Sequence, residues 1–421
     1  MTQPARRVLA IAPMPPEKSA YALARYSRSP DSIEDSIKWV HTHSSEKFWE
    51  QFYFDYGHAS IADLGHVIVC FEQISELAAI RLEDEPLWDG QAKSSRYQNF
   101  ASSNWFTPDG IRGQETEASY LGILRGLSTV YRALHEPLCR FLTEREPRPE
   151  SMTAAAYQRA IAARAFDVTR YLLPLAAQTN VGQVVSIRTL EKQISRLLSS
   201  QLSELRLIGE ELKEACQKPP VNLWGELSGQ AAGLTEPLAP TLARYARANA
   251  YQAEVYSDLA RHAKEVLRGT GLDQPANWGT SEPVDLVEPH HPLDEVVTTL
   301  LYRVSQAPYR KILSVVNDWT EKQKQDTIDV ALHRRGLYDD LIKEFRSGYA
   351  FLFDILMDIG GWRDMHRHRR CQQVQQNFTT VHGFETPPIL AEAGLEQEYR
   401  EAMGLVKTDI EQLRKSSQEA A

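Results

Sequence analysis

The segment from Asp358 to Thr380 constrains the fold and chemistry of this 421-residue chain more than any other. Apolar residues lead into it at three- and four-residue steps, which predicts a helix with one buried face; they are Leu341, Phe345, Tyr349, Leu352, Leu356 and Ile359. Gly360 and Gly361 then loosen or bend this run. Basic residues follow, with no acidic residue after Asp364: Arg363, His366, Arg367, His368, Arg369 and Arg370. Because arginines offer forked donors for phosphate or for a delocalised anion, the segment predicts an anion-binding site.

Three other interpretations of this basic run are open. A run of charges is commonly a solvated helix face. Zinc binding by His366 and His368 is disfavoured, because residues two apart point to different sides of a helix and the flanking arginines repel a dication, so we predict no metal. A nucleic-acid contact is disfavoured by the net charge of −9 and by the lack of a basic domain.

The composition is typical of an ordinary globular protein with room for two or three domains. Its four cysteines are scattered singly, with no CxxC pair, which fits a reducing cytoplasm. No apolar run is long enough to span a membrane, and prolines interrupt the apolar patch at the amino terminus. We therefore expect a cytoplasmic protein with neither membrane nor nucleic acid as partner.

Helical patterns account for most of the chain. A helix capped by Ser32 or Asp31 is expected to extend to about residue 55, and 67–71 is typical of a buried strand or helix core. Further helices are predicted at 74–82, 115–145, 153–173, 184–205, 240–267 and from 296 onward, with linkers at 219–240 and 269–292.

An internal repeat is indicated by two similar segments. Arg25-Tyr26-Ser27-Arg28-Ser29-Pro30 and Arg303-Val304-Ser305-Gln306-Ala307-Pro308 share the pattern Arg-x-Ser-x-x-Pro, with 278 positions between Ser27 and Ser305. The helix ending at Asp84 corresponds to the one ending at Arg367, 283 positions later. We therefore predict a first module at 1–217, a helical connector and linker at 218–292, and a partial second module at 293–421.

These segments resemble the flavin-dependent thymidylate synthases. That family carries R-H-R-x-x-S-x-N-E-x-S-x-R-Y after an apolar helix, with A-R-x-S and G-H-x-S upstream and R-x-x-L-P and N-x-R downstream. The first module matches in the same order, over about residues 22–206: Ala24-Arg25-Tyr26-Ser27, Gly57-His58-Ala59-Ser60, Ser94-Ser95-Arg96-Tyr97, Arg170-Tyr171-Leu172-Leu173-Pro174 and Ser186-Ile187-Arg188. The second module matches over about 302–380, through Arg303-Val304-Ser305 and Arg367-His368-Arg369.

The two modules depart from the family pattern in complementary ways. The first has Asp84-Glu85-Pro86 in place of R-H-R, Asp89 at the first Ser of the signature, and Ser186 for Asn. The second keeps R-H-R but lacks G-H-x-S and a second R-x-x-L-P, and the later signature positions hold Gln372, Val374, Gln375 and Asn377. A fused pair of partial copies could therefore build one site between them.

The resemblance implies roles for individual residues. Ser94, Arg96, Tyr97 and Arg170 would bind the substrate, dUMP or a related pyrimidine nucleotide. Arg367, His368 and Arg369 would be catalytic and face flavin and pyrimidine, since arginines stabilise negative charge that develops on a reduced flavin or an enolate. Ser27, Ser60 and Arg188 would contact FAD together with the Arg-His-Arg motif.

The expected activity is reductive methylation of dUMP, with methylenetetrahydrofolate giving the carbon and NADPH the electrons through FAD. The alternative is a divergent duplicate that binds flavin or nucleotide as a non-synthase or structural partner subunit. The family implies an α+β fold, predominantly helical, with a small antiparallel sheet in each of two related modules. It also implies a homo-oligomer, here a dimer that mimics the family's tetramer.

Overall fold

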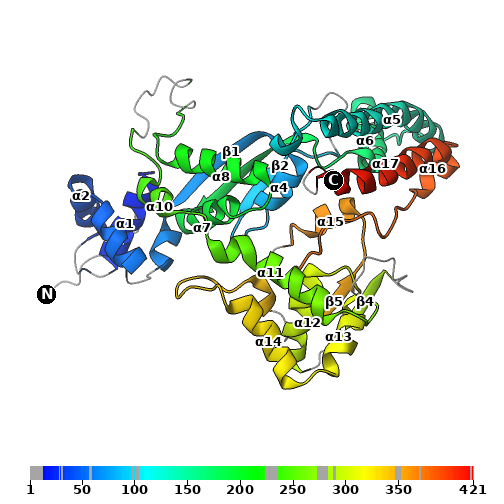
Figure 1. The fold of residues 1–421 in the computed structure, drawn as a ribbon. Helices are drawn as coiled ribbons and strands as arrows, with labels where there is room; N and C mark the ends of the chain where they lie inside the picture. The colour runs from blue at the N-terminus through cyan, green and yellow to red at the C-terminus, as the bar shows by residue number, and fades with distance from the viewer. Residues whose placement is uncertain are drawn as a thin grey trace.

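The computed structural model describes residues 13–27, 29, 32–55, 59–96, 99–100, 104–222, 227, 235–272, 283–287, 291–346, 352–368, 371–417 and 420. It is predominantly helical with small antiparallel sheets (Figure 1), so the expected α+β class is confirmed at that level. Within the described residues, no helix is long and apolar enough to cross a membrane.

The first half of the chain surrounds a three-stranded antiparallel sheet of order β1-β3-β2. Its elements are α1 (Pro16–Tyr26), α2 (Ile33–Thr42), α3 (Glu46–Phe48), η1 (Trp49–Asp55), η2 (Ala59–Leu64), β1 (His66–Ser75), α4 (Glu76–Leu82), β2 (Asp89–Ala92), η3 (Asp109–Ile111), α5 (Glu115–Arg145), α6 (Ala154–Thr169), η4 (Arg170–Leu172), β3 (Gln178–Ser186), α7 (Ile187–Leu198) and α8 (Ser203–Cys216).

Alternation of side chains in the sheet explains its single buried face. Val67 lies opposite Val185 and Phe71 opposite Val181, and all four are buried in the core formed with α7, α8 and α4. Residues between them point to the other face, where Ile68 is 73% exposed. The segment 67–71 is therefore a strand, one of the two possibilities that its sequence allowed.

The second half of the chain forms a group of helices, and its last helices then pack against the first half. Its elements are α10 (Pro240–Tyr245), α11 (Ala250–Val266), β4 (Val284–Val287), α12 (Pro292–Val304), α13 (Tyr309–Asn317), α14 (Glu321–Leu332), η5 (Lys343–Arg346), β5 (Leu352–Ile355), α15 (Ile359–Met365), α16 (Pro388–Glu392) and α17 (Glu396–Ser416). In Figure 1, α15 lies between this helical group and the helices α5, α6 and α17.

The carboxyl-terminal helices pack on the first half of the chain. Leu390 of α16 and Tyr399 of α17 are buried in one core with Leu134 and Leu138 of α5 and Ile161 of α6. Segment 388–416 thus shares a core with residues of the predicted first module, although its sequence belongs to the predicted second one. The domain boundaries themselves stay a prediction.

The order of elements is similar in the two halves. Helices α1, α2 and α3 precede β1 and α4, as α12, α13 and α14 precede β5 and α15. Ser27 follows the end of α1 as Ser305 follows the end of α12, and Ser75 and Asp358 cap the amino termini of α4 and α15. A duplication predicts this order, but the two-module interpretation is not confirmed by it.

Several predictions about local structure are wrong, and three of them involve strands. The apolar run from Leu341 to Ile359 is not one helix, because residues 352–355 form β5, which pairs with β4 in the segment 269–292 that was expected to be a linker. The predicted helix 184–205 is the end of β3 followed by α7 and α8. For the two segments predicted to be helices, a strand partner far away in the sequence decides the structure of residues whose local spacing also suits a helix.

Candidate active site

Two arginines and two carboxylates meet where the first half of the chain contacts α15. Arg96 contacts Asp167 through Nε (3.1 Å) and Asp364 through Nη2 (2.7 Å). Arg170 contacts the same two carboxylates through Nη2, at 3.0 Å from Asp167 and 3.6 Å from Asp364. The Arg170 side chain is only 10% exposed, and its Nε is buried without a hydrogen-bond partner among the residues that the structure describes. We call these four residues the arginine–aspartate cluster.

Arg363 joins α15 to the segment that carries Arg96. Its Nη1 donates to Oγ of the buried Ser95 (3.2 Å), and its Nη2 lies 2.7 Å from Oε2 of Glu76. Burial raises the pKa of Glu76, and the charge of Arg363 opposes that rise. A carboxylate that is 3% exposed needs such a partner, so this ion pair fixes α15 against the first turn of α4.

The start of α15 is built for close approach. Asp358 caps the helix by accepting from the amide of Gly361 at 2.8 Å. A Cβ on Gly360 would lie 2.8 Å from Nη2 of Arg170 and 3.0 Å from Cε1 of Tyr171. The absence of a side chain at Gly360 therefore lets Arg170 reach the cluster, and the helix begins at the glycines that were expected to bend it.

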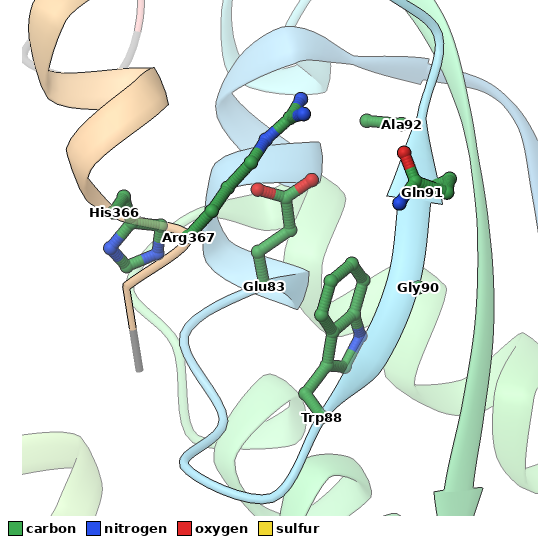
Figure 2. A pocket seen from close by; sticks show the side chains of 7 residues that line it. All are labelled: Glu83, Trp88, Gly90, Gln91, Ala92, His366 and Arg367. Atoms are coloured by element: carbon green, nitrogen blue, oxygen red, sulfur yellow. The ribbon is translucent and has the colours of Figure 1, made fainter. Parts of the chain in front are cut away.

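A pocket of about 100 Å³ lies between the end of α15 and β2 (Figure 2). It is lined by Glu83, Trp88, Gly90, Gln91, Ala92, His366 and Arg367. Figure 2 shows Arg367 extending past Glu83 toward β2. His366 is only 8% exposed; its Nδ1 lies 3.3 Å from Oε1 of Gln373, and its Nε2 has no hydrogen-bond partner within the described part of the chain.

The predicted substrate and catalytic residues are divided between these two places. Arg96 and Arg170 lie in the cluster, and Arg367 lines the pocket. Ser94 accepts from the amide of Arg96 at 3.3 Å, so it shapes the same loop. His368 is exposed at the end of the turn after α15. Tyr97 and Arg369 lie outside the described residues.

The other residues predicted to bind FAD lie outside the cluster and the pocket, and two of them interact with nearby protein groups. Arg188 pairs with Asp63 at 2.7 Å, the Ser27 hydroxyl donates to the carbonyl of Ala24, and Ser60 is exposed in η2. Arg188 follows the end of β3 that pairs with His66, whereas Glu76 follows the opposite end of the sheet. Since β3 has nine residues, these ends are roughly 27 Å apart. Neither Ser60 nor Arg188 lines the pocket that contains Arg367, which lies against β2 where this strand pairs with the middle of β3.

The acidic residues that replace the first Arg-His-Arg form ion pairs with residues from other parts of the chain. Glu85 pairs with Arg196 at 2.7 Å, and Asp84 lies 3.3 Å from Nζ of Lys343. Burial by itself would raise the pKa of Asp84, but the charges of Lys343, Arg196 and Arg81 outweigh it and lower that pKa. These two acids thus fix α4 to α7 and η5.

Sequence reasoning missed the acidic partners of the site. Asp167, three residues before Arg170 on a predicted helix, was detectable by its i, i+3 spacing. Glu76, an acid within the apolar helical pattern 74–82, was a second signal. Asp364 was noticed only as the last acid before the basic run, since its contact with Arg96 joins residues 268 positions apart.

Comparison of the sequence with known proteins identifies a family and several relatives. Residues 9–219 match the family model described as thymidylate synthase complementing protein. Two UPF0159 proteins, from Chlamydia pneumoniae and Chlamydia muridarum, are each 24% identical over 379 residues, which is 85% of this chain and 65% of theirs. A UPF0159 protein of Thermoplasma acidophilum is 22% identical over 428 residues, 90% of this chain and 78% of that protein. The chain thus spans just under two thirds of the length of its chlamydial relatives.

Comparison with solved structures gives two further findings. One is the flavin dependent thymidylate synthase ThyX of Helicobacter pylori complexed with FAD and dUMP, with a TM-score of 0.32, 14% identity and coverage of 48% of this chain and 89% of that chain. The other is the UMP/dUMP methylase PolB of Streptomyces cacaoi bound with 5-Br dUMP, with a TM-score of 0.33, 15% identity and coverage of 54% and 88%.

Proposed function

Since the chain belongs to the thymidylate synthase complementing protein family, we propose that it binds a pyrimidine nucleoside monophosphate, dUMP or a close relative, and methylates it reductively with FAD. The observation that carries the proposal is the arginine–aspartate cluster. Arg96 and Arg170, which the family resemblance assigns to the substrate, meet α15 from the distant segment that carries the Arg-His-Arg motif.

The cluster has the chemistry of a phosphate-binding site in which two carboxylates of the chain now occupy the place of the anion. Two guanidinium groups converge on the same two acids, and guanidinium forks bind phosphate as readily as carboxylate. A phosphate dianion carries more charge and more acceptor oxygens than the single carboxylate of Asp364. We therefore propose that the substrate phosphate displaces Asp364 and accepts hydrogen bonds from donors that include Nε of Arg170, which has no partner among the described residues.

The residues around the pocket fit a flat ring with a polar edge. Trp88 supplies an aromatic wall, Arg367 a cation, and His366 a buried nitrogen for which the described residues offer no partner. These residues would hold the ring system of FAD or the pyrimidine against β2. Bound FAD would supply the hydride, taken from NADPH, that completes the methyl group after methylenetetrahydrofolate gives its carbon. Arg367 would stabilise negative charge on the pyrimidine or the reduced flavin.

A second copy of the chain is part of this proposal. Ser60 and Arg188 are not among the residues that line the pocket with Arg367, and Arg188 pairs with Asp63. A homo-oligomer in which another copy brings its Ser60 and Arg188 to the pocket would complete the FAD site. His368 and Arg369 would then join Arg367 in facing the flavin.

A second candidate function is supported by the acidic residues that stand in place of the first Arg-His-Arg motif. Asp84 and Glu85 form ion pairs with Lys343 and Arg196 of the same chain. The positions that correspond to the first Arg-His-Arg therefore have a structural role in this chain. A protein that binds nucleotide or flavin without synthase activity, as a partner subunit, is consistent with that loss.

The test begins with binding and continues to turnover. Isothermal titration with dUMP should give saturable binding that Arg96→Gln weakens by roughly tenfold or more, because a charged hydrogen bond is lost. Arg140→Gln is the matched control, since Arg140 pairs with Glu136 on the exposed surface of α5. Titration with FAD should show quenching of flavin fluorescence that Arg367→Gln reduces.

Turnover separates the two candidates. Release of the C5 proton of dUMP that requires methylenetetrahydrofolate, NADPH and FAD would support the synthase. Binding without proton release, in a preparation with FAD bound, would favour the non-synthase duplicate. Unchanged dUMP affinity in Arg96→Gln would refute the assignment of the phosphate site.

A further inference from the structure

His366 is a buried imidazole that the Arg-His-Arg comparison leaves without a role. It stands one residue before the motif, at the carboxyl-terminal end of α15, and its ring lines the pocket beside Arg367. It is 8% exposed, and its Nε2 has no hydrogen-bond partner among the described residues. A buried polar nitrogen without a partner is costly, which indicates that a bound molecule supplies the missing group.

The surroundings fix which ring nitrogen carries the proton. Nε2 of Gln373 donates to the carbonyls of Met365 (3.0 Å) and His368 (3.1 Å), so its Oε1 is the atom that faces Nδ1 of His366. An amide oxygen only accepts, and therefore Nδ1 of His366 donates. Nε2 is then left with a lone pair and acts as a hydrogen-bond acceptor.

The charge state of the ring agrees with this assignment. Burial lowers the pKa of His366; Lys343 and Arg81 lower it further, whereas Asp84 and the hydrogen bond to Gln373 oppose the shift. The imidazole is consequently neutral near pH 7, and a neutral imidazole has one donor and one acceptor.

The pocket offers hydrogen-bond donors beside this acceptor. Arg367 carries a guanidinium that can only donate, and Gln91 of β2 carries an amide that donates through its nitrogen. A planar ring with an N–H flanked by two carbonyl groups, an imide edge, matches that arrangement of one acceptor with donors around it. Trp88 provides the apolar wall against which such a ring packs.

We propose that Nε2 of His366 accepts a hydrogen bond from the imide N–H of a ring bound in this pocket. The inference rests on the proposed function for the presence of a ring. Uracil has this edge, and so does the isoalloxazine ring of a flavin. Cytosine does not, because its N3 carries a lone pair that would face the lone pair of His366. His366 is thus a specificity-determining residue for imide rings.

Matched pairs of ligands, with and without an imide N–H, test this hydrogen bond directly. The first pair is dUMP and dCMP, which share sugar and phosphate and so share any contact with Arg96 and Arg170. The second pair is lumiflavin and 3-methyllumiflavin, in which a methyl group replaces the imide hydrogen. With the full-length protein, isothermal titration should show a preference of roughly tenfold or more for the imide member of one pair, since the mismatched ring leaves a buried group unpaired.

Three variants identify the residue responsible. His366→Ala should reduce the preference to about threefold or less. His366→Gln should keep affinity for dUMP and gain affinity for dCMP if uracil is the ring, because a glutamine amide can turn to accept or to donate. His41→Ala, at an exposed position of α2, should leave the preference unchanged. Circular dichroism and the thermal midpoint check that each variant is folded; if His366→Ala is not, His366→Gln alone decides the test.

The outcomes separate this inference from the proposed function. Loss of preference in the nucleotide pair assigns the pocket to uracil, and loss in the flavin pair assigns it to the isoalloxazine ring. Tight binding of dUMP and dCMP without preference, together with no preference between the lumiflavins, would overturn the role of His366 and leave the phosphate site intact. Failure of all four ligands to bind a folded protein would overturn both.

Discussion

Gly360 decides how closely α15 approaches Arg170, and Gly360→Ala tests this contact. The added Cβ would lie 2.8 Å from Nη2 and 3.1 Å from Cζ of Arg170, and 3.0 Å from Cε1 of Tyr171. Gly361 offers a matched control on the same turn, because a Cβ there would meet its nearest atom, Oδ2 of Asp358, at 3.6 Å. Neither glycine has a positive φ, so backbone strain does not distinguish the two substitutions.

The expected magnitudes follow from two opposing effects. Alanine in place of glycine within a helix stabilises by about 0.5–1 kcal/mol. Overpacking costs about 1–3 kcal/mol. At position 360 a shift of the Arg170 guanidinium would relieve part of this steric clash and so reduce the cost. We therefore expect Gly361→Ala to be slightly stabilising and Gly360→Ala to be less stable than it by about 1–2 kcal/mol.

Displacement of Arg170 should appear mainly in ligand binding. If its guanidinium loses its place between Asp167 and Asp364, the site loses one charged hydrogen bond, worth about 1.5–3 kcal/mol. Affinity for dUMP should then fall by roughly tenfold or more in Gly360→Ala and stay unchanged in Gly361→Ala. Urea denaturation measures the stability difference, and isothermal titration measures the affinity.

Equal behaviour of the two variants would refute this reasoning. If both alanines give the same urea midpoint and the same dUMP affinity, the approach of α15 to Arg170 does not control the site. A loss of stability in Gly360→Ala without a loss of affinity would keep the packing argument but remove Arg170 from substrate binding.

Three further predictions concern single side chains. Asp364→Asn should tighten binding of inorganic phosphate several-fold, because a competing carboxylate is removed from the arginines; weaker binding in titration would show that Asp364 mainly orients them. Ser75→Ala should cost about 2 kcal/mol in urea denaturation, since it removes the cap of α4 and a partner of buried Glu204, and a loss under about 0.5 kcal/mol would contradict this. Burial raises the pKa of Glu17 from 4.5 to about 7; the unfolded chain therefore loses this proton first, and stability should fall as pH rises from 4.5 through 7, by up to roughly 3 kcal/mol. Glu17→Gln should flatten that part of the stability–pH curve, and an unchanged slope would disprove the assignment.

Local sequence determined most of the helices and their caps. Helix α5 covers residues 115–145 as its apolar spacing predicted, and Ser32 caps α2 as expected from the residue type. These features depend on neighbours within four residues, where spacing and capping chemistry are strong signals. The ordered motifs around Arg96 and Arg170 likewise predicted the family without structural information, and the family model confirms it.

Tertiary structure decided everything that joins distant segments. The strand at 352–355 depends on pairing with β4, about 70 residues earlier, and the return of α17 to α5 depends on burial of Tyr399. The site depends on Asp364 reaching Arg96, and on Arg363 reaching Glu76 and Ser95. An amino-acid sequence fixes which groups can pair, but only the folded chain brings a particular carboxylate to a particular guanidinium, because such contacts act over a few ångströms and leave no periodic pattern along the chain.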